Sequence, residues 1–210
     1  YGIMAISDDG GETFYASEPI VGLGPIQPAL AVRKNGDIVA YMRDAGPPPK
    51  RIQTSVSRDD GLTWSTAMDS DLPNPGSSCQ VANLKNGLWV LVYNDTERGR
   101  HSLAVSLSDD DGETWRGFRE VALGRRRHEL VFHPGYVHDC GIHHPKFTVT
   151  GQGKAIVFTG QDFADAEHEN IHRQAVIFDL DWLYETSRSI DFSNGYDDLS
   201  VFKMSKRPWG

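Results

Sequence analysis

The sequence has 210 residues, of which 39% are hydrophobic and 24% charged, as in an ordinary globular protein with a sizeable core. Its formal net charge of −8 argues against non-specific binding to nucleic acid or to an acidic membrane surface. No apolar run approaches the ~20 residues of a membrane helix, and the first residues carry no visible signal peptide, so we expect no membrane insertion.

A turn motif, Ser-x-Asp-x-Gly-x-Thr-aromatic, occurs three times at intervals of 50 and 51 residues. Its members are Ser7, Asp9, Gly11, Thr13 and Phe14; Ser57, Asp59, Gly61, Thr63 and Trp64; and Ser108, Asp110, Gly112, Thr114 and Trp115. An aspartate in such a turn accepts hydrogen bonds from nearby backbone N–H groups, and the glycine closes the hairpin. We therefore expect Asp9, Asp59 and Asp110 to have a structural role, as parts of an Asp box, and not a catalytic one.

A second turn repeats in step with the Asp boxes. Lys34-Asn35-Gly36 and Lys85-Asn86-Gly87 are 51 residues apart, and Gly151-Gln152-Gly153 continues the series in a weaker form. Short β-rich segments lie between the turns. The expected strands are 28–33, 38–43, 52–57 and 64–70 in the first unit, 79–84, 88–93, 102–108 and 115–122 in the second, and 145–150, 154–159 and 173–179 in the third.

Four antiparallel strands every ~50 residues predict an all-β fold, the β-propeller. A β-sandwich is the alternative, but a sandwich does not repeat a turn motif in register. The blade repeats are expected at 1–20, 26–70, 79–122 and 143–182, which makes about three and a half blades. Because an incomplete ring exposes strand edges, we expect the remainder of the propeller to be a partner of this chain. Residues 183–210 are expected to form an exit linker and the start of a further β domain.

The two ends of such a blade differ in composition. The tight turns described above share one rim, so the other rim must carry the longer loops at 43–51, 71–78, 94–101, 123–144 and 160–172. These loops vary in length and are rich in Arg, His and Asp. Variable polar loops on a rigid scaffold are where function usually lies, so the functional site is expected on this rim.

The Asp boxes, together with segments 24–28, 71–75, 92–94 and 98–100, resemble the bacterial sialidase-like (neuraminidase) glycoside hydrolases with BNR repeats. The resemblance covers about residues 1–120. It implies a six- or seven-bladed propeller that hydrolyses sialylated or other acidic glycans in the secreted or periplasmic space, without a cofactor. The basic run Arg125–Arg127 and the segment His138–His144 fall outside the sialidase pattern.

The resemblance also implies functional side chains, because sialidases hold a substrate carboxylate with arginines and use a tyrosine and acidic residues in catalysis. Arg43 and Asp44 are candidate catalytic residues at the end of a strand, the alternative being a structural ion pair between them. Tyr93 ends the matching strand of the next blade, and its alternative is a packed aromatic. The candidate substrate-binding residues are Gln27, Arg51, Asn74, Asn94, Arg100 and Asp162.

Five histidines in two loops form a separate candidate cluster. His138, His143 and His144 are expected in the loop that leads into the third unit, and His168 and His172 in a later loop of the same blade. Histidine can act as a general base or a metal ligand, but no metal motif is present and we expect no metal site. A solvated surface position is the alternative for each of them.

Three functions remain open from the sequence. The first is a sialidase-like glycosidase, the second is a lyase that acts on uronic-acid polysaccharides with His and Tyr, and the third is a non-catalytic glycan-binding propeller.

The cysteines Cys79 and Cys140 stand near the start of the first strand in adjacent blades, so an inter-blade disulfide is a further hypothesis.

Overall fold

The computed structural model describes residues 1–100, 102–123, 141–162 and 172–184, which form an all-β fold with one short helix. The strands are β1 (Ala5–Ile6), β2 (Tyr15–Ala16), β3 (Pro25–Val32), β4 (Ile38–Asp44), β5 (Arg51–Ser57), β6 (Met68–Pro73), β7 (Gln80–Asn83), β8 (Trp89–Tyr93), β9 (Ser102–Ser108), β10 (Arg116–Leu123), β11 (Gly141–Val149), β12 (Lys154–Asp162) and β13 (His172–Asp179), and the helix is α2 (Leu180–Tyr184). Within the described residues, no helix is long and apolar enough to cross a membrane.

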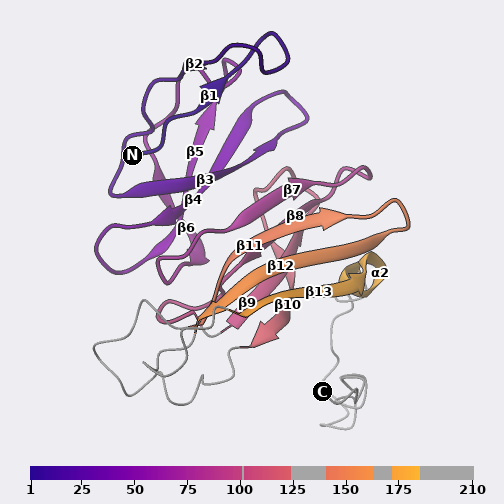
Figure 1. The fold of residues 1–210 in the computed structure, drawn as a ribbon. Helices are drawn as coiled ribbons and strands as arrows, with labels where there is room; N and C mark the ends of the chain where they lie inside the picture. Colours follow the sequence, from indigo (N-terminus) through magenta and orange to yellow (C-terminus); the bar gives the residue numbers. More distant parts are fainter. Residues whose placement is uncertain (101, 124–140, 163–171, 185–210) are drawn as a thin grey trace, which may run out of the picture.

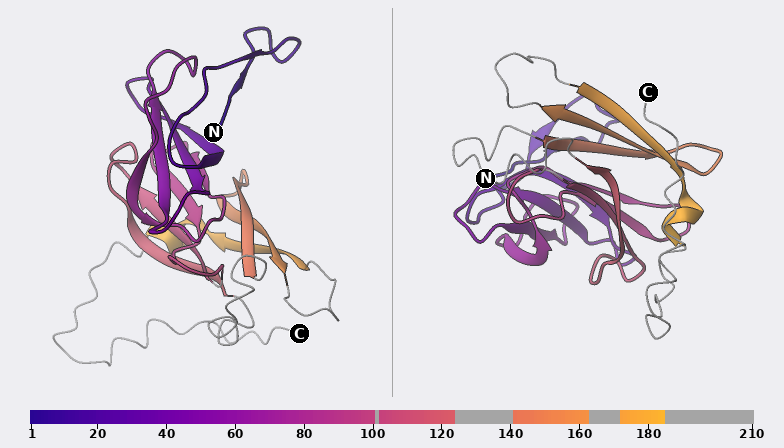
Figure 2. Two further views of the ribbon diagram at one scale, coloured as in Figure 1. Left: turned by 90° about the vertical axis from the view of Figure 1, so that its left-hand side faces the viewer. Right: turned by 90° about the horizontal axis from the view of Figure 1, so that it is seen from below.

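Four antiparallel sheets follow one another along the chain, as the repeat predicts. Each sheet is a meander, with strand orders β1-β2, β3-β4-β5-β6, β7-β8-β9-β10 and β11-β12-β13. Figures 1 and 2 show the sheets as successive layers, from β1–β2 near the N-terminus to β11–β13 and α2. The fold is therefore a partial β-propeller, in which each sheet is a blade; we number the complete sheets blades 1, 2 and 3 and call their first strands, β3, β7 and β11, the inner strands.

The same tight turn joins the first two strands of every blade. In each turn the glycine N–H donates to the carbonyl three residues earlier, at 3.0 Å in all three blades. Gly36, Gly87 and Gly153 have φ of 94°, 84° and 76°, a region that suits glycine. The weaker third copy in the sequence is thus the same turn, and the three glycines align the blades residue by residue.

The three Asp boxes also share one hydrogen-bond pattern. The serine hydroxyl donates to aspartate Oδ1 at 2.8, 2.8 and 2.7 Å, and the threonine hydroxyl donates to Oδ2 at 2.6, 2.6 and 2.5 Å. Hydrogen bonds from Thr13, its backbone and Ser7 lower the pKa of Asp9, and those from Thr63 do the same for Asp59. Both oxygens of each carboxylate accept hydrogen bonds from the turn itself, which agrees with the structural role expected for these aspartates.

An apolar core fills each of the three interfaces between successive sheets. The first lies between the N-terminal hairpin and blade 1, and includes Ile20, Ala40, Met42 and Ala67. The second lies between blades 1 and 2, and its largest members are Tyr41, Trp89, Leu91 and Tyr93. The third lies between blades 2 and 3, where Val92, Leu103, Val105, Ile142 and Val157 meet Leu183 of α2. Each sheet therefore buries apolar side chains against its neighbours along the chain, as propeller blades do.

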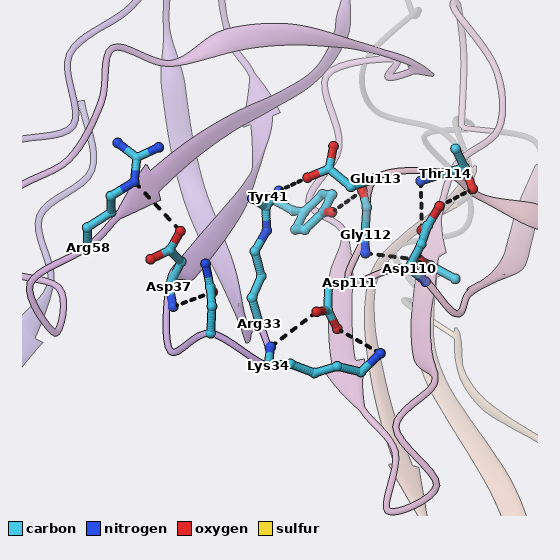
Figure 3. A network of polar contacts seen from close by, with 12 residues as sticks. Arg33, Lys34, Asp37, Tyr41, Arg58, Asp110, Asp111, Gly112, Glu113 and Thr114 are labelled. Carbon is cyan, nitrogen blue, oxygen red and sulfur yellow. Dashed lines mark hydrogen bonds and ion pairs between the residues drawn. The ribbon is translucent and has the colours of Figure 1, made fainter.

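The Asp box of blade 2 also binds the turn of blade 1 (Figure 3). The Tyr41 hydroxyl donates to the Gly112 carbonyl at 3.1 Å, and the Arg33 guanidinium pairs with Glu113 at 2.5 Å. The Lys34 backbone N–H donates to an Asp111 carboxylate oxygen at 3.2 Å. The Asp box is therefore a clamp between blades as well as a turn.

Blade 3 has α2 after its third strand, where blades 1 and 2 have an Asp box. The Asn86 amide, in the turn of blade 2, donates to the Tyr184 hydroxyl at 3.0 Å. Arg119 of β10 lies over the Trp182 ring, 4.2 Å from its centroid. The helix thus takes over the contact with the preceding blade. The further domain expected in 183–210 stays a prediction, because residues 185–210 lie outside the described part.

Candidate functional site

The strand registers place Arg43 and His143 at the same rim of the propeller. Arg43 pairs with Ile26 near the start of β3, and His143 pairs with Gly160 near the start of β11. Both pairs lie at the end of the blade away from the glycine turns, which join the other ends of the same strands. The rim with the long loops is therefore one surface, as the alternating strand directions predict, and we call it the loop rim.

Three equivalent positions lie where the inner strands begin. Gln27, Ser78 and His144 each precede the turn glycine of their blade by nine residues. Gln27 and His144 have φ of 53° and 51°, and each lies within a register shift of its strand, between Ile26 and Ala29 and between His143 and Lys146. Such a bulge re-aims a side chain and is frequent next to functional sites. We call these three residues the inner-strand triplet.

The second and third members of the inner-strand triplet contact one another across the blade boundary. Ser78 Oγ lies 2.9 Å from His144 Nδ1, within hydrogen-bond distance. Ser78 was not singled out from the sequence. Its equivalence to Gln27 is visible once the turn glycines are aligned, but its contact with a residue 66 positions later is not.

Arg43 is held by the first member of the triplet. Its Nη1 donates to Gln27 Oε1 at 3.4 Å, and its buried Nε has no hydrogen-bond partner among the described residues. The ion pair with Asp44 considered as the alternative is not formed. A guanidinium with spare donors at a loop rim is suited to bind a planar anion such as a carboxylate.

Asp44 is 2% exposed and its carboxylate is used by the backbone of the following loop. Oδ1 accepts from the Gly46 N–H at 2.7 Å, and Oδ2 accepts from the Arg51 N–H at 3.2 Å. Asn74 is fully buried, and its Oδ1 accepts from the N–H groups of Gly76 and Ser77 at 2.9 and 3.1 Å. Both side chains close loops in this structure, which favours a structural role for them over contact with a substrate.

Asn94 and Arg100 tether blade 3 to blade 2. The Asn94 amide donates to the carbonyls of Ser102 and Ile142 at 2.6 and 2.9 Å. The Arg100 guanidinium donates to the Gly76 carbonyl at 2.8 Å, and its own carbonyl accepts from the Ile142 N–H at 2.6 Å. These contacts fix the start of β11, two residues before His144.

Two further candidate residues are already engaged within the protein: Arg51 is ion-paired and Tyr93 is buried. Arg51 forms an ion pair with Glu97 at 2.6 Å, between the loops of blades 1 and 2. Tyr93 is 1% exposed and packs in the core between those blades. Burial raises the pKa of the Tyr93 phenol to about 12, so the hydroxyl keeps its proton at neutral pH. This position matches the packed aromatic that the sequence offered as the alternative.

His143 and His144 lie within β11, and the expectation that they belong to the preceding loop is wrong. The strand begins at Gly141, not at residue 145, because a bulge at His144 lets the pairing with β12 continue past Pro145. The two rings meet edge to face, with centroids 4.7 Å apart at 83°. His138 lies outside the described residues, and of Asp162 only the backbone is described, paired with Gly141.

A hollow of about 530 Å³ adjoins the histidines on the open face of blade 3. Its walls include His143, His144, Lys146, Phe158 and Arg173. In the part of the chain that the structure describes, no group of three His, Cys, Asp or Glu side chains is placed to hold a metal ion.

Cys79 is a free thiol buried between blades 1 and 2. Burial raises its pKa to about 12, which makes the thiol unreactive in the folded state. Cys140, its proposed disulfide partner, lies outside the described residues.

Comparison with known proteins gives one family and a consistent fold. A family model described as a BNR repeat-like domain matches residues 2–157. The chain is similar in structure to the NanB sialidase of Streptococcus pneumoniae (TM-score 0.59, 20% identity, 85% of this chain and 27% of that one). It is also similar to the intramolecular trans-sialidase of Ruminococcus gnavus (TM-score 0.60, 14% identity, 85% and 38%). No curated protein matches the chain significantly.

An α-L-arabinofuranosidase from Fusarium graminearum is a further structural relative (TM-score 0.51, 18% identity, 74% of this chain and 48% of that one). The chain thus spans between about a quarter and a half of the length of these structures. At such identities the likeness concerns the fold, and the chemistry has to be argued from the side chains on the loop rim.

Proposed function

Because the chain belongs to the BNR repeat-like domain family, we propose that it is part of a glycoside hydrolase acting on sialylated or other acidic glycans. The family match covers the N-terminal hairpin, blades 1 and 2 and the start of blade 3 up to residue 157, which include both Arg43 and the inner-strand triplet. Two of the structural relatives are a sialidase and a trans-sialidase, and a third acts on arabinofuranosides according to its name. This supports a glycosidase, and the acidic substrate rests on Arg43.

The observation that carries the proposal is the state of the Arg43 guanidinium. The other two candidate arginines of the loop rim have firm partners, because Arg51 pairs with Glu97 and Arg100 donates to a carbonyl. Within the described residues, Arg43 makes only the long contact to Gln27, and its buried Nε has no hydrogen-bond partner there. Leaving such a donor unsatisfied costs free energy, which a bound carboxylate would recover.

His144 is the proposed proton-transfer group at this rim. It is exposed, it borders the hollow on blade 3, and a hydrogen bond with Ser78 holds its Nδ1. Histidine is the usual general acid or base near neutral pH. The lyase alternative requires a tyrosine as the acid, and the burial of Tyr93 counts against that residue. We also propose a secreted or periplasmic location, on the ground of the sialidase resemblance alone.

The remainder of the propeller is the proposed partner of blade 3. Phe158 is 50% exposed, whereas Tyr41 and Val92, at the equivalent position five residues after the turn glycine, are buried by the next blade. Ile177 is 62% exposed on the same face. Phe158→Trp would report on this contact: after subtraction of the wild-type emission from the five native tryptophans, its fluorescence should shift to the blue in a version of the protein that contains the rest of the propeller, and equal emission would contradict the packing.

A glycan screen tests the proposed activity. The protein is incubated with sialosides and with uronic-acid polysaccharides, and the products are analysed. Release of free acidic sugar is expected. Unsaturated products that absorb in the ultraviolet would instead establish the lyase, and binding without turnover would establish a non-catalytic glycan-binding propeller. Arg43→Ala should abolish activity on acidic substrates. Arg58 is an exposed arginine at the opposite rim, so Arg58→Ala should leave this activity unchanged.

A further inference from the structure

Lys146 and Arg173 bring two positive charges to the open face of blade 3. Both side chains are exposed, and both line the hollow beside Phe158. Among the described residues, the walls of this hollow contain no aspartate or glutamate, and neither cation forms an ion pair. In a chain with a net charge of −8, the hollow is therefore a local excess of positive charge.

The equivalent of Arg173 in each of the other two blades is an apolar residue in a core. The residue two positions after the turn glycine pairs with Ser57 in blade 1, Ser108 in blade 2 and Phe178 in blade 3. Five residues before these partners stand Ile52, Leu103 and Arg173. Ile52 and Leu103 are 0% exposed and belong to the cores that face the following blade. Arg173 thus occupies a position that is buried in both blades that have a following blade in the structure.

Lys146 is placed in the same way on the inner strand of blade 3. It precedes its turn glycine by seven residues, as Ala29 does in blade 1 and Gln80 in blade 2. Ala29 belongs to the core between blades 1 and 2, and Gln80 is half-buried. Lys146 pairs with Phe158, whose equivalents are also covered by the next blade. Both cations therefore lie on the part of blade 3 that corresponds to a core between blades.

A blade that packs on this face must remove both charges from water. Burial of an unpaired guanidinium or ammonium group is strongly unfavourable, so buried charges in proteins are paired. We propose that the following blade brings carboxylate side chains to Arg173 and Lys146, at the place where the interface between blades 1 and 2 is apolar. The proposal rests on the packing of the remaining propeller suggested above, but not on the reaction that the propeller catalyses.

The pairing gives this interface a requirement that the first two interfaces lack. An apolar face packs against many apolar surfaces, whereas Arg173 favours a partner with a carboxylate at one defined point, because its guanidinium binds both carboxylate oxygens. A blade without that carboxylate would leave the charge buried and unpaired, and is disfavoured as a neighbour. The two cations therefore select which blade follows blade 3.

Zero-length cross-linking tests the pairing in the protein that contains the rest of the propeller, without any glycan. A carbodiimide activates a carboxylate, and the Lys146 amine then displaces the urea and forms an amide if the two groups are in contact. Peptide mass spectrometry is expected to find Lys146 joined to an aspartate or glutamate of the following blade. An amine reagent should modify Lys146 about tenfold more slowly than Lys85, an exposed lysine in the turn of blade 2, because a paired ammonium holds its proton more tightly.

Charge reversal measures the contribution of the pair in the same protein. Arg173→Glu should lower the melting temperature by about 5 °C or more, and Arg173→Lys, which keeps the charge, should lower it less. Arg58→Glu is the control, since the Arg58 side chain is 82% exposed at the opposite rim, and should shift the melting temperature by about 1 °C at most.

Three results would overturn the proposal. They are equal reactivity of Lys146 and Lys85, a cross-link from Lys146 to a carboxylate within residues 1–210, and equal melting temperatures for Arg173→Glu and Arg58→Glu. Protection of Lys146 that requires an added acidic glycan would also overturn it, and would assign the hollow to a ligand. If the protein cleaves no acidic glycan, the proposed function fails, while the cross-link still decides whether the pair exists.

Discussion

The hydroxyl of Tyr41 in blade 1 donates a hydrogen bond to the carbonyl of Gly112 in blade 2, at 3.1 Å. The same tyrosine ring meets the rings of Trp89 and Trp115 edge to face, with centroids 6.4 and 5.7 Å away. One side chain thus contacts the turn, the core and the motif aromatic of the next blade. Gly112 is required for two reasons. Its φ of 84° is unfavourable for a residue with a side chain, and a Cβ at this position would clash with Tyr41 and Trp89.

Gly112→Ala should destabilise the protein by about 3 kcal/mol, because it adds a steric clash to a strained backbone. A Cβ at Gly112 would lie 2.3 Å from the Tyr41 hydroxyl oxygen and 2.7 Å from the Trp89 ring. Gly87→Ala is the matched control, since Gly87 has the same φ of 84° and open space around it. It should cost only about 1 kcal/mol. Urea unfolding measures both, and equal losses would refute the inter-blade clamp.

Acid should weaken the Asp boxes in a defined pH range. Burial acts to raise the pKa of Asp110, but hydrogen bonds from Thr114 and Ser108 outweigh it and lower the pKa to about 2. A carboxyl group whose pKa is lowered by folding stabilises the protein above its ordinary pKa, and this contribution is lost as the pH falls toward 2.

Asp110→Asn removes the titrating group and tests this expectation. The free energy of unfolding of the wild type should fall more between pH 5 and pH 2.5 than that of Asp110→Asn. Asp109→Asn, which changes an ion pair with Arg116 outside the Asp-box bonds, serves as the control. If both variants keep the full pH dependence of the wild type, the hydrogen bonds of Asp110 do not favour its ionised form.

Arg43→Lys separates charge from geometry at the loop rim. The lysine keeps the positive charge but cannot form a two-pronged contact with a carboxylate. We expect affinity for an acidic glycan to fall about 10- to 100-fold, because hydrogen bonds to charged groups are worth about 1.5–3 kcal/mol. Isothermal titration calorimetry gives the affinity, with a neutral glycan of the same size as the control ligand. Equal loss for both ligands would rule out a carboxylate contact.

Tyr93→Phe should leave activity unchanged and cost about 1 kcal/mol of stability through the lost hydrogen bond with Ser106, whereas Tyr93→Ala should cost about 3–5 kcal/mol through the cavity it creates. The reason is that Tyr93 is 1% exposed between blades 1 and 2. Thermal unfolding and turnover on the glycan identified by the screen are measured for both. A large fall in kcat for Tyr93→Phe, without loss of stability, would reinstate the tyrosine as a catalytic group.

Much of the fold could be predicted from the sequence because the turns repeat. The glycine turns and Asp boxes require particular residues, and each strand in blades 1 and 2 was expected within a few residues of its observed bounds. The prediction failed at β11, where His143-His144-Pro145 reads as a loop. A bulge interrupts the alternation of the strand at that point, and nothing in the local sequence indicates that pairing resumes behind it.

The candidate site could be predicted only in outline. The rim that carries the site could be predicted, because the alternating strand directions decide which loops share it. The hydrogen-bond partners of each candidate side chain could not be predicted, because these partners are distant in sequence. Asp44 is occupied by the loop that follows it, Asn94 by the start of β11, and His144 by Ser78 in another blade. Such contacts form only when the sheets pack against one another, so they cannot be predicted from composition or local sequence.

The clamps described for the Asp box and for α2 always join one blade to the next in the chain. Stability in such an array is close to a sum of single-unit and nearest-neighbour terms, as in a one-dimensional Ising chain. Gly112→Ala should therefore weaken the interface between blades 1 and 2 and leave the one between blades 2 and 3 intact. Hydrogen exchange should then show that blade 1 opens independently, while blades 2 and 3 remain protected together.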